Sequence, residues 1–315
     1  MKLFLLLTAL LCSSGATIAR EPFHPQSFTF LLQADAKFKP REKGVQALAE
    51  SGRDLVVIDY SYTSGRFEKW TRQEIEKIRG GKKGRKVVSY ISIGEAENYR
   101  AYWRPVWDRD NDGRPDKGAP SFLLPINPGW AGNYRVKYWD PAWQKIVLLM
   151  IDEIILQGFD GVYLDIVDAF EGFEYNPANN KWVKGRINPE TGLSYREEMV
   201  SWVGKIAEHV RARKGDFLVI PQNGAQLLEH DGFVSRISAI GIEDLFTEGN
   251  KKRDLESVAL ILKFLEEARK EGKPILLIEY PTVKSLRDYS IAAAKEQGLI
   301  LLLTDRSLKT LGDSP

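Results

Sequence analysis

Residues 158–168 read Gly-Phe-Asp-Gly-Val-Tyr-Leu-Asp-Ile-Val-Asp, and this stretch carries the pattern that decides the fold. Its middle part, 160–165, is a short run rich in β-branched and aromatic residues that ends in a carboxylate. A helical pattern precedes it and begins at Asp140-Pro141, two residue types favoured at the start of a helix. Because the apolar run is nearly continuous, it is typical of a strand buried on both faces, as in a parallel sheet.

Seven more runs of this kind occur along the chain, at residues 28–33, 54–59, 86–93, 217–222, 238–243, 274–279 and 299–304. Helical patterns lie between runs. Thr71 and Glu74 match a capping box, and residues 194–213 and 253–271 are apolar at helical spacing. Eight strands with intervening helices predict an α/β fold, the (β/α)8 TIM barrel, as a single domain over residues 20–315.

Two further features of the sequence bear on this prediction. Only about ten residues follow the last apolar run, so the final helix is expected to be short or missing. A doubly wound parallel sheet is the alternative architecture. That fold usually has a glycine-rich turn after its first strand, and this sequence has no such turn.

The first 19 residues have the three regions of a signal peptide. A positive residue follows the initiator Met, residues 3–12 are apolar but too few to span a bilayer as a helix, and small residues lead to Ala19. Ala16 is a rival cleavage site, and a buried N-terminal helix is the alternative interpretation. A signal peptide over residues 1–19 predicts a secreted or periplasmic protein with no membrane attachment after cleavage.

Composition argues against several classes of function. The 315 residues have a formal net charge of +2, which provides no basic surface for nucleic acid. One Cys and three His argue against a Cys-rich zinc site and a His-based metal centre. The G-x-S-x-G and H-E-x-x-H patterns are also absent from the sequence. No cofactor is therefore expected for the chemistry.

Polar residues, most of them acidic, follow the apolar runs. In a barrel these positions surround the active site at the carboxyl ends of the strands. They are Gln33, Asp35, Asp59, Glu95, Asp165, Asp168, Gln222, Asn223, Glu243, Glu279 and Asp305. A solvated or structural role is an equal alternative for any single one. As a set, however, they place carboxylates where burial and neighbouring charges can separate pKa values, and a carboxylate pair is what glycoside hydrolysis requires.

Aromatic residues are concentrated between residues 99 and 143, where five of the eight Trp lie. Sugars expose C–H faces that stack on such rings, so this region is a candidate for saccharide subsites. For Trp103, Trp107 and Trp143 the alternative is that they pack helices onto the barrel. Trp130 lies in a Pro- and Gly-containing loop, which favours contact with substrate.

Four aspartates match positions 1, 3, 5 and 9 of a calcium-binding loop, with Gly at position 6: Asp108, Asp110, Asp112 and Asp116. Position 12 is Ala119, so the bidentate Glu of the full pattern is missing. A structural calcium ion is one interpretation, and an Asp/Asn/Gly turn without a metal is the other.

Longer motifs carry a resemblance to a known family. They are Tyr-Ile-Ser-Ile-Gly-Glu-Ala-Glu-Asn-Tyr-Arg at 90–100, Asn-Tyr-Arg-Val-Lys-Tyr-Trp-Asp-Pro at 133–141, the 158–168 stretch, Gly-Ile-Glu-Asp-Leu-Phe at 241–246, and Glu279-Tyr280. Together they resemble exported proteins related to glycoside hydrolase family 114. The resemblance implies a TIM barrel with endo-α-1,4-polygalactosaminidase-like activity on amino-sugar polymers, and it places the two catalytic carboxylates on Asp165 and Glu243.

On this assignment Asp165 is the nucleophile, or the base of an inverting enzyme, and Glu243 is the general acid, with Glu279 as the rival partner. The residues expected to contact or orient the sugar are Asp59, Tyr90, Glu95, Trp130, Asp168, Asn223, Glu279 and Tyr280. The expected partner is therefore a polysaccharide or oligosaccharide substrate.

The sequence departs from the family pattern in two places near this site. Ile166 stands where the family often has Asn, and about twenty additional residues, near 171–193, include Trp182. The natural polymer therefore stays open. The predicted function is hydrolysis of an α-linked, amino-sugar-containing polysaccharide. The alternatives are a carbohydrate-binding barrel without turnover and, more weakly, a metal-dependent deacetylase or lyase.

Overall fold

The computed structural model describes residues 23–63, 68–176 and 178–315. The predicted signal peptide, 1–19, lies outside these residues. Among the described residues, no helix has the length and apolar character needed to cross a membrane.

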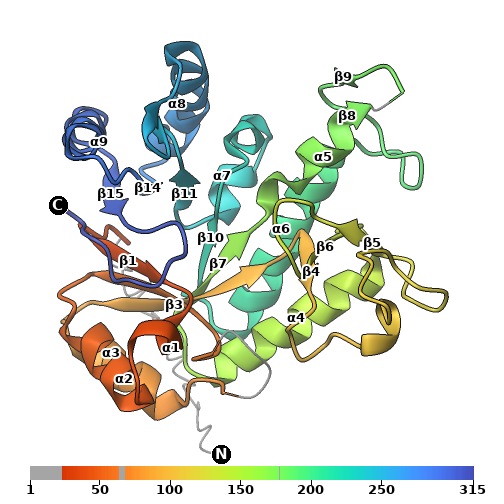
Figure 1. Ribbon diagram of the computed structural model, residues 1–315. Coiled ribbons are helices and arrows are strands. Elements are labelled where there is room, and N and C mark those ends of the chain that lie inside the picture. The colour runs from red at the N-terminus through yellow and green to blue at the C-terminus, as the bar shows by residue number, and fades with distance from the viewer. Residues whose placement is uncertain (1–22, 64–67, 177) are drawn as a thin grey trace, which may run out of the picture.

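Eight parallel strands form the centre of the molecule (Figure 1). They are β1 (Phe28–Leu31), β2 (Leu55–Asp59), β3 (Lys86–Ser92), β7 (Gly161–Asp165), β10 (Leu218–Pro221), β11 (Ile240–Glu243), β14 (Ile275–Glu279) and β15 (Ile300–Leu303). Five pair in the order β1-β2-β3-β7-β10 and three in the order β11-β14-β15. A parallel bridge between Gln222 and Gly241 joins the two sheets. All eight predicted strands are therefore present, in barrel order.

The C-terminal segment lies at the seam between β15 and β1. Asp313 forms an antiparallel bridge with Leu303 of β15, and the hydroxyl of Thr29 in β1 donates a 2.7 Å hydrogen bond to the carbonyl of Leu311. No ladder between β15 and β1, and no helix after β15, occurs in the described part of the chain. The fold is therefore of the TIM-barrel type with an open ladder, and the final helix is missing, as predicted.

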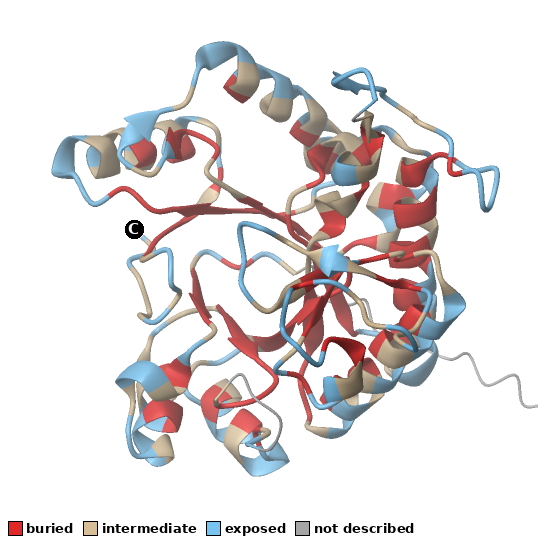
Figure 2. Cartoon of the chain, turned by 45° about the vertical axis from the view of Figure 1, so that its right-hand side comes forward, coloured by how far each residue is buried: buried red, intermediate tan, exposed pale blue. Residues whose placement is uncertain are grey.

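Helices surround the strands and expose their outer faces (Figure 2). They are α1 (Ala34–Lys37), α2 (Arg41–Glu50), α3 (Arg72–Gly80), α4 (Pro141–Leu156), α5 (Phe170–Glu174), α6 (Tyr195–Arg213), α7 (Phe233–Arg236), α8 (Leu255–Lys270) and α9 (Lys284–Glu296). The capping box of Thr71 and Glu74 is present in α3, and the Asp140 side chain caps α4 through the amide of Ala142. Between β10 and β11 the helical layer is reduced to α7 and the 3-10 helix η3 (Ala225–Glu229).

Alternate strand residues form two apolar cores. Val57, Val88 and Tyr163 belong to the cluster enclosed by the strands, whereas their neighbours Val56 and Val87 pack in the cluster beneath the helices. Side chains two positions apart on a strand point the same way. The inward row therefore continues to Asp59, Tyr90 and Asp165 at the carboxyl ends.

Insertions after β3, β7 and β11 rise above those ends. The elements after β3 are β4 (Glu95–Glu97), the 3-10 helix η1 (Pro105–Trp107), β5 (Leu123–Ile126) and β6 (Asn133–Val136). Those after β7 are the 3-10 helix η2 (Val167–Ala169), α5, β8 (Tyr175–Asn176) and β9 (Lys181–Trp182), and those after β11 are β12 (Thr247–Glu248) and β13 (Lys251–Lys252). Figure 1 shows the first two groups beside each other, beyond β3 and β7.

Candidate active site

A cleft of about 960 Å³ opens at the carboxyl ends of the strands. The predicted catalytic and sugar-contacting residues that line it are Asp59, Tyr90, Glu95, Trp130, Asp165, Asp168, Asn223, Glu243 and Tyr280. Of that predicted set, only Glu279 is missing from the described lining. Residues taken from separate strand ends of the sequence are thus brought together in one place.

Asp165 ends β7 with both carboxylate oxygens engaged. The hydroxyl of Tyr90 donates to Oδ2 at 2.7 Å, and the amide of Ile166 donates to Oδ1 at 2.8 Å. The second contact is made where the chain turns sharply after β7. Ile166 forms this turn with a left-handed backbone, φ 56°. Gly94 allows this turn, since a Cβ at residue 94 would lie 2.2 Å from the carbonyl oxygen of Ile166.

The Ile166 conformation gives a physical meaning to the departure from the family pattern. Asn adopts the left-handed region readily, whereas a β-branched residue there is strained. Such strain is of the order of 1–3 kcal/mol and is held in place by the surrounding structure. Ile166 therefore keeps the turn that the family's Asn would favour, but at a cost to stability.

The environment of Asp165 strongly favours its protonated form. Burial, followed by the charge of Glu243, raises the pKa of Asp165 to about 7, against the opposing hydrogen bonds from Tyr90 and Ile166. Asp165 is therefore partly protonated near neutral pH, with the charge of Glu243 nearby.

Glu243 ends β11 and is held by three neighbours. Asn223 donates its side-chain amide to Oε1 at 3.2 Å, and the hydroxyl of Tyr280 donates to Oε2 at 2.8 Å. Arg306 lies 3.9 Å from Oε2 and stacks over the Tyr280 ring, 4.1 Å from its centroid. Arg306 is in turn fixed by Asp244, whose two oxygens lie 2.8 and 2.6 Å from Nη2. The carboxylate is therefore oriented from strand, loop and tail together.

Tyr163 forms the floor beneath the two carboxylates. It is fully buried two residues before Asp165, and its hydroxyl has no hydrogen-bond partner among the described residues. A Cβ on Gly241, two residues before Glu243, would lie 1.8 Å from that hydroxyl, so only glycine fits at 241. The Tyr163 side chain therefore crosses the barrel interior from β7 to β11 and fixes the spacing of the strands that carry the pair.

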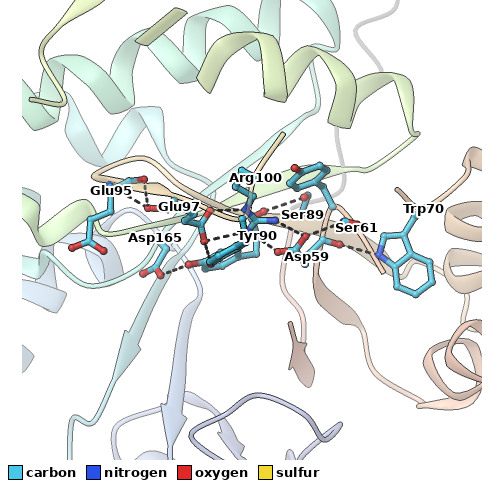
Figure 3. Close-up of polar contacts among 12 residues, drawn as sticks. Asp59, Ser61, Trp70, Ser89, Tyr90, Glu95, Glu97, Arg100 and Asp165 are labelled. Atoms are coloured by element: carbon cyan, nitrogen blue, oxygen red, sulfur yellow. Dashed lines mark hydrogen bonds and ion pairs between the residues drawn. The ribbon is translucent and has the colours of Figure 1, made fainter. Parts of the chain in front are cut away.

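A buried ionic cluster lies beside Tyr90 (Figure 3). Arg100 is 1% exposed and contacts both oxygens of Asp59, at 2.9 and 2.7 Å, and Oε2 of Glu97, at 2.6 Å. Burial raises the pKa of Asp59 although Arg100 opposes it. Burial and the charge of Asp165 raise the pKa of Tyr90 well above its ordinary value. Tyr90 therefore remains a neutral donor to Asp165.

Two more predicted carboxylates face the cleft. Glu95 is held by the side-chain amides of Asn127 at 2.8 Å and Asn133 at 3.3 Å, and burial raises its pKa. Asp168 lies in η2, one turn beyond Asp165, and burial followed by the charge of Asp165 raises its pKa well above the ordinary value. The cleft is therefore lined by a ring of acids, as the strand-end positions predict.

Glu279 has a different place. It is fully buried, and its oxygens accept hydrogen bonds from the amides of Phe246 at 2.7 Å and Thr247 at 3.0 Å and from the Thr247 hydroxyl. Its register partner in the adjacent strand β15 is Leu303, whereas Glu243 pairs with Ile278. Glu279 is thus one residue out of step with the inward row. This position corrects its prediction as a sugar-contacting residue, because the side chain supports the loop after β11 instead.

The tryptophans divide into packing and exposed residues. Trp103, Trp107 and Trp143 are buried and contact other aromatic rings, so the packing alternative holds for all three. Trp130 is 56% exposed in the turn between β5 and β6, and Trp182 is 65% exposed in β9. Both line the cleft. They provide the aromatic walls that a saccharide site needs.

The aspartate loop after η1 brings together three of its four predicted calcium ligands. Oxygens of Asp108, Asp110 and Asp112 lie within 4.8 Å of one another. Carboxylate oxygens suit Ca²⁺. Asp116 is not among these converging residues, and its carboxylate accepts a 2.7 Å hydrogen bond from the amide of Arg109. The residues therefore fit a three-carboxylate site rather than the four-aspartate site predicted.

Several residues in the cleft or directly behind its lining were not singled out as site residues from the sequence. Arg100 and Glu97 lie in the 90–100 motif, but the ion pair between Arg100 and Asp59 depends on a contact across 41 residues of chain. Arg306 follows the last strand by three residues, and that position was its only sequence signal. Tyr163 lies in the 158–168 stretch, where inward strand alternation from Asp165 could have identified it.

Comparisons with known proteins concern the family and the fold of the chain. The sequence model of glycoside-hydrolase family GH114 matches residues 12–315. A protein of Deinococcus radiodurans is 35% identical over 268 residues, which are 85% of this chain and 78% of that protein. A protein of Methanocaldococcus jannaschii is 36% identical over 240 residues, which are 75% of this chain and 63% of that protein. Both relatives are described as uncharacterized.

Two solved structures share the fold. The glycoside hydrolase domain of PelA from Pseudomonas aeruginosa superposes with a TM-score of 0.62 at 19% identity, covering 92% of this chain and 99% of that domain. Ega3 of Aspergillus fumigatus, solved in complex with galactosamine, has a TM-score of 0.62 at 17% identity. The match covers 92% of this chain and 94% of that protein. At such identities the likeness establishes the architecture alone.

Proposed function

The chain belongs to glycoside-hydrolase family GH114, and from this membership we propose that Asp165 and Glu243 are its catalytic carboxylates and that its substrate is an α-linked, amino-sugar-containing polysaccharide. The observation that carries the proposal is their convergence on one cleft, where the charge of Glu243 helps to raise the pKa of Asp165 to about 7. Glycoside hydrolysis requires two carboxyl groups beside the bond that is cleaved, one acting as an acid and the other as a nucleophile or base.

The chemistry requires one group of the pair to donate a proton to the glycosidic oxygen while its bond to the anomeric carbon breaks. The other group, ionised, attacks that carbon in a retaining reaction or takes a proton from the attacking water in an inverting one. We assign the second role to Asp165 and the first to Glu243, in line with the family resemblance. The raised pKa of Asp165 favours the reversed roles, with Asp165 as the acid in the free enzyme.

Leaving groups of graded acidity separate the two assignments. A variant that lacks the general acid retains most activity on a substrate whose leaving group departs without protonation, whereas a variant that lacks the nucleophile or base does not. Glu243→Gln is therefore expected to be rescued by an activated aryl glycoside, and Asp165→Asn is not. Rescue of Asp165→Asn alone would reverse the assignment.

The proposed substrate class rests on the charge of the cleft. Seven carboxyl groups line it, the catalytic pair included, against the three cations Arg100, Arg135 and Arg306. Acidic walls favour a polymer that carries ammonium groups, as a deacetylated amino sugar does. The structural similarity to Ega3, solved with galactosamine, supports the same class. We therefore propose endo-cleavage of an α-1,4-linked, galactosamine-containing polymer.

Release of reducing ends from a panel of amino-sugar polymers tests the proposal. The native chain is expected to release reducing ends from an α-1,4-galactosamine polymer but not from an α-1,4-glucan. Asp216→Asn is a suitable control, because Asp216 is exposed just before β10, at the opposite end of the barrel. Binding of the polymer without any release of reducing ends would favour the carbohydrate-binding alternative instead.

Two further proposals concern export and calcium. The signal-peptide pattern of residues 1–19 supports secretion to the periplasm or the medium, and N-terminal sequencing of the exported chain would locate the cleavage site. The three converging aspartates after η1 support a structural calcium ion, which would stabilise the loop beside β5 without taking part in the chemistry.

A further inference from the structure

The hairpin β8–β9 presents an aromatic ring at the edge of the cleft. Its two strands pair antiparallel, with Tyr175 opposite Trp182. The two rings lie 5.3 Å apart, and Trp182 remains 65% exposed. In Figure 1 the hairpin projects from the body of the molecule beyond α5. An exposed indole on a projecting hairpin is not explained by packing, because its other face has no described cover.

The base of this hairpin is firmly anchored. Glu174, 3% exposed, accepts two 2.7 Å hydrogen bonds from Arg196 of α6 and a third, also 2.7 Å, from the amide of Gly185. The amide of Val183 donates to the carbonyl of Glu174 at 2.9 Å. Arg–carboxylate pairs with two parallel hydrogen bonds fix geometry as well as charge. The position of Trp182 at the cleft is therefore set by the anchored residues on both sides of it.

The hairpin and the residues directly after it contribute to two cavities that meet at Glu243. Trp182 lines the main cleft, whereas Lys184, two residues later, lines a neighbouring cavity of about 600 Å³. The two cavities share a border of four residues: Asp168, Glu171, Asn223 and Glu243. The second cavity extends past that border between η3 and α8, to Leu260 and Phe264. A chain bound across Glu243 would therefore pass beside the hairpin in both cavities.

We propose that the β8–β9 hairpin is a saccharide-binding arm, in which Trp182 stacks on a sugar ring at a subsite remote from the bond that is cleaved, while the cavity beyond Glu243 holds the chain on the other side. The inference rests on the proposed function and adds a residue and a subsite to it. Because the arm lies outside the catalytic pair, it acts only on chains long enough to reach it. Trp182 therefore sets a preference for long substrates and leaves the chemical step unchanged.

The test compares α-1,4-linked galactosamine oligosaccharides of two to eight units. Trp182→Ala is expected to raise KM for the longest oligomers about tenfold, the order of an aromatic contact, and to leave kcat and the values for the shortest oligomers unchanged. Trp182→Tyr, which keeps a stacking ring, should restore most of the affinity. Leu149→Ala is the control, since Leu149 is 56% exposed on α4 and lines neither cavity.

Binding to the Asp165→Asn chain, measured by calorimetry, gives a second readout that does not depend on turnover. There, adding Trp182→Ala should weaken the longest oligomer about tenfold and the shortest not at all. Equal loss for all lengths, or no loss for any, overturns the inference while leaving the proposed function intact. A native chain that neither binds nor cleaves these oligomers overturns the proposed function and the inference with it.

Discussion

Replacing Asp165 with Asn tests whether the ionised carboxyl group of Asp165 lowers the free energy of unfolding at neutral pH. Burial and the charge of Glu243 raise the pKa of Asp165 from 3.8 to about 7. A group with a higher pKa in the folded chain binds its proton more tightly there. Its contribution to stability is therefore complete below pH 3.8 and is lost as the pH rises toward 7. Through this group the native chain should lose stability between pH 5 and pH 8.

The magnitude follows from the shift. Three pKa units correspond to about 4 kcal/mol in the free energy of unfolding, of which about 2–3 kcal/mol are lost between pH 5 and pH 8. Because the carboxyl group also contacts solvent in the cleft, screening reduces the effect, and these free energies are upper limits. An Asn side chain can keep both contacts, since its oxygen can accept from the Ile166 amide and its nitrogen can donate to the Tyr90 oxygen. The variant therefore avoids the cost of ionising a buried carboxyl group and keeps the hydrogen bonds to Ile166 and Tyr90.

Urea unfolding at pH 5 and pH 8, followed by Trp fluorescence, measures the effect. Asp165→Asn should gain up to about 2–3 kcal/mol over the native chain on going from pH 5 to pH 8. Burial also raises the pKa of Glu279 to about 7, so the native slope alone would not isolate Asp165, and the difference between the two chains does. Asp216→Asn should show the native slope. Parallel slopes for Asp165→Asn and the native chain would refute the reasoning.

Four other predictions follow from the same contacts. Arg100→Met leaves two buried carboxylates without their cation and should lower the free energy of unfolding by about 3–5 kcal/mol; a urea midpoint like that of the native chain would contradict it. Ile166→Asn should raise the free energy of unfolding by about 1 kcal/mol with kcat unchanged, and a destabilised variant would disprove the assignment of strain. Glu279→Gln turns an amide donor toward the amides of the β11 loop and should cost about 1–3 kcal/mol of stability, whereas a loss of kcat as large as in Asp165→Asn would return Glu279 to the catalytic pair. Calcium at a hundredfold excess over its Kd should stabilise the 108–116 loop and the chain by about 2.7 kcal/mol, and identical melting in calcium and in EDTA would exclude the site.

The apolar runs predict the strands because burial on both faces leaves a continuous pattern in the sequence. The closure of the barrel could not be predicted in the same way. Residues 311–313 contact Thr29 and Leu303. The contact with Thr29 joins parts of the chain that are far apart in the sequence, and no local pattern predicts either contact. The short helices between β10 and β11 were not predicted. A full helix was expected there because strands and helices alternate elsewhere in the chain, although this connection has no strong helical periodicity.

The candidate site was predictable as far as strand ends define it. Asp165 and Glu243 both continue the inward row of their strands, so for these two residues the end of an apolar run correctly predicted a place in the cleft. Glu279 ends an equally apolar run but is one residue out of step with that row, and a one-residue difference turns a side chain to the other face. The Pro- and Gly-containing loop around Trp130 separated this residue from the buried Trp103 and Trp143, whereas the exposure of Trp182 is seen only in the folded chain.

The cleavage of a defined α-1,4-linked galactosamine oligosaccharide tests the central claim most directly. Chain lengths of the products, followed over time by mass spectrometry, should show internal cleavage by the native chain. In Asp165→Asn and in Glu243→Gln the rate should fall by about 10²–10⁴-fold, with the fold intact by circular dichroism. Shortened products formed at the native rate by either variant would contradict the assignment of the catalytic pair.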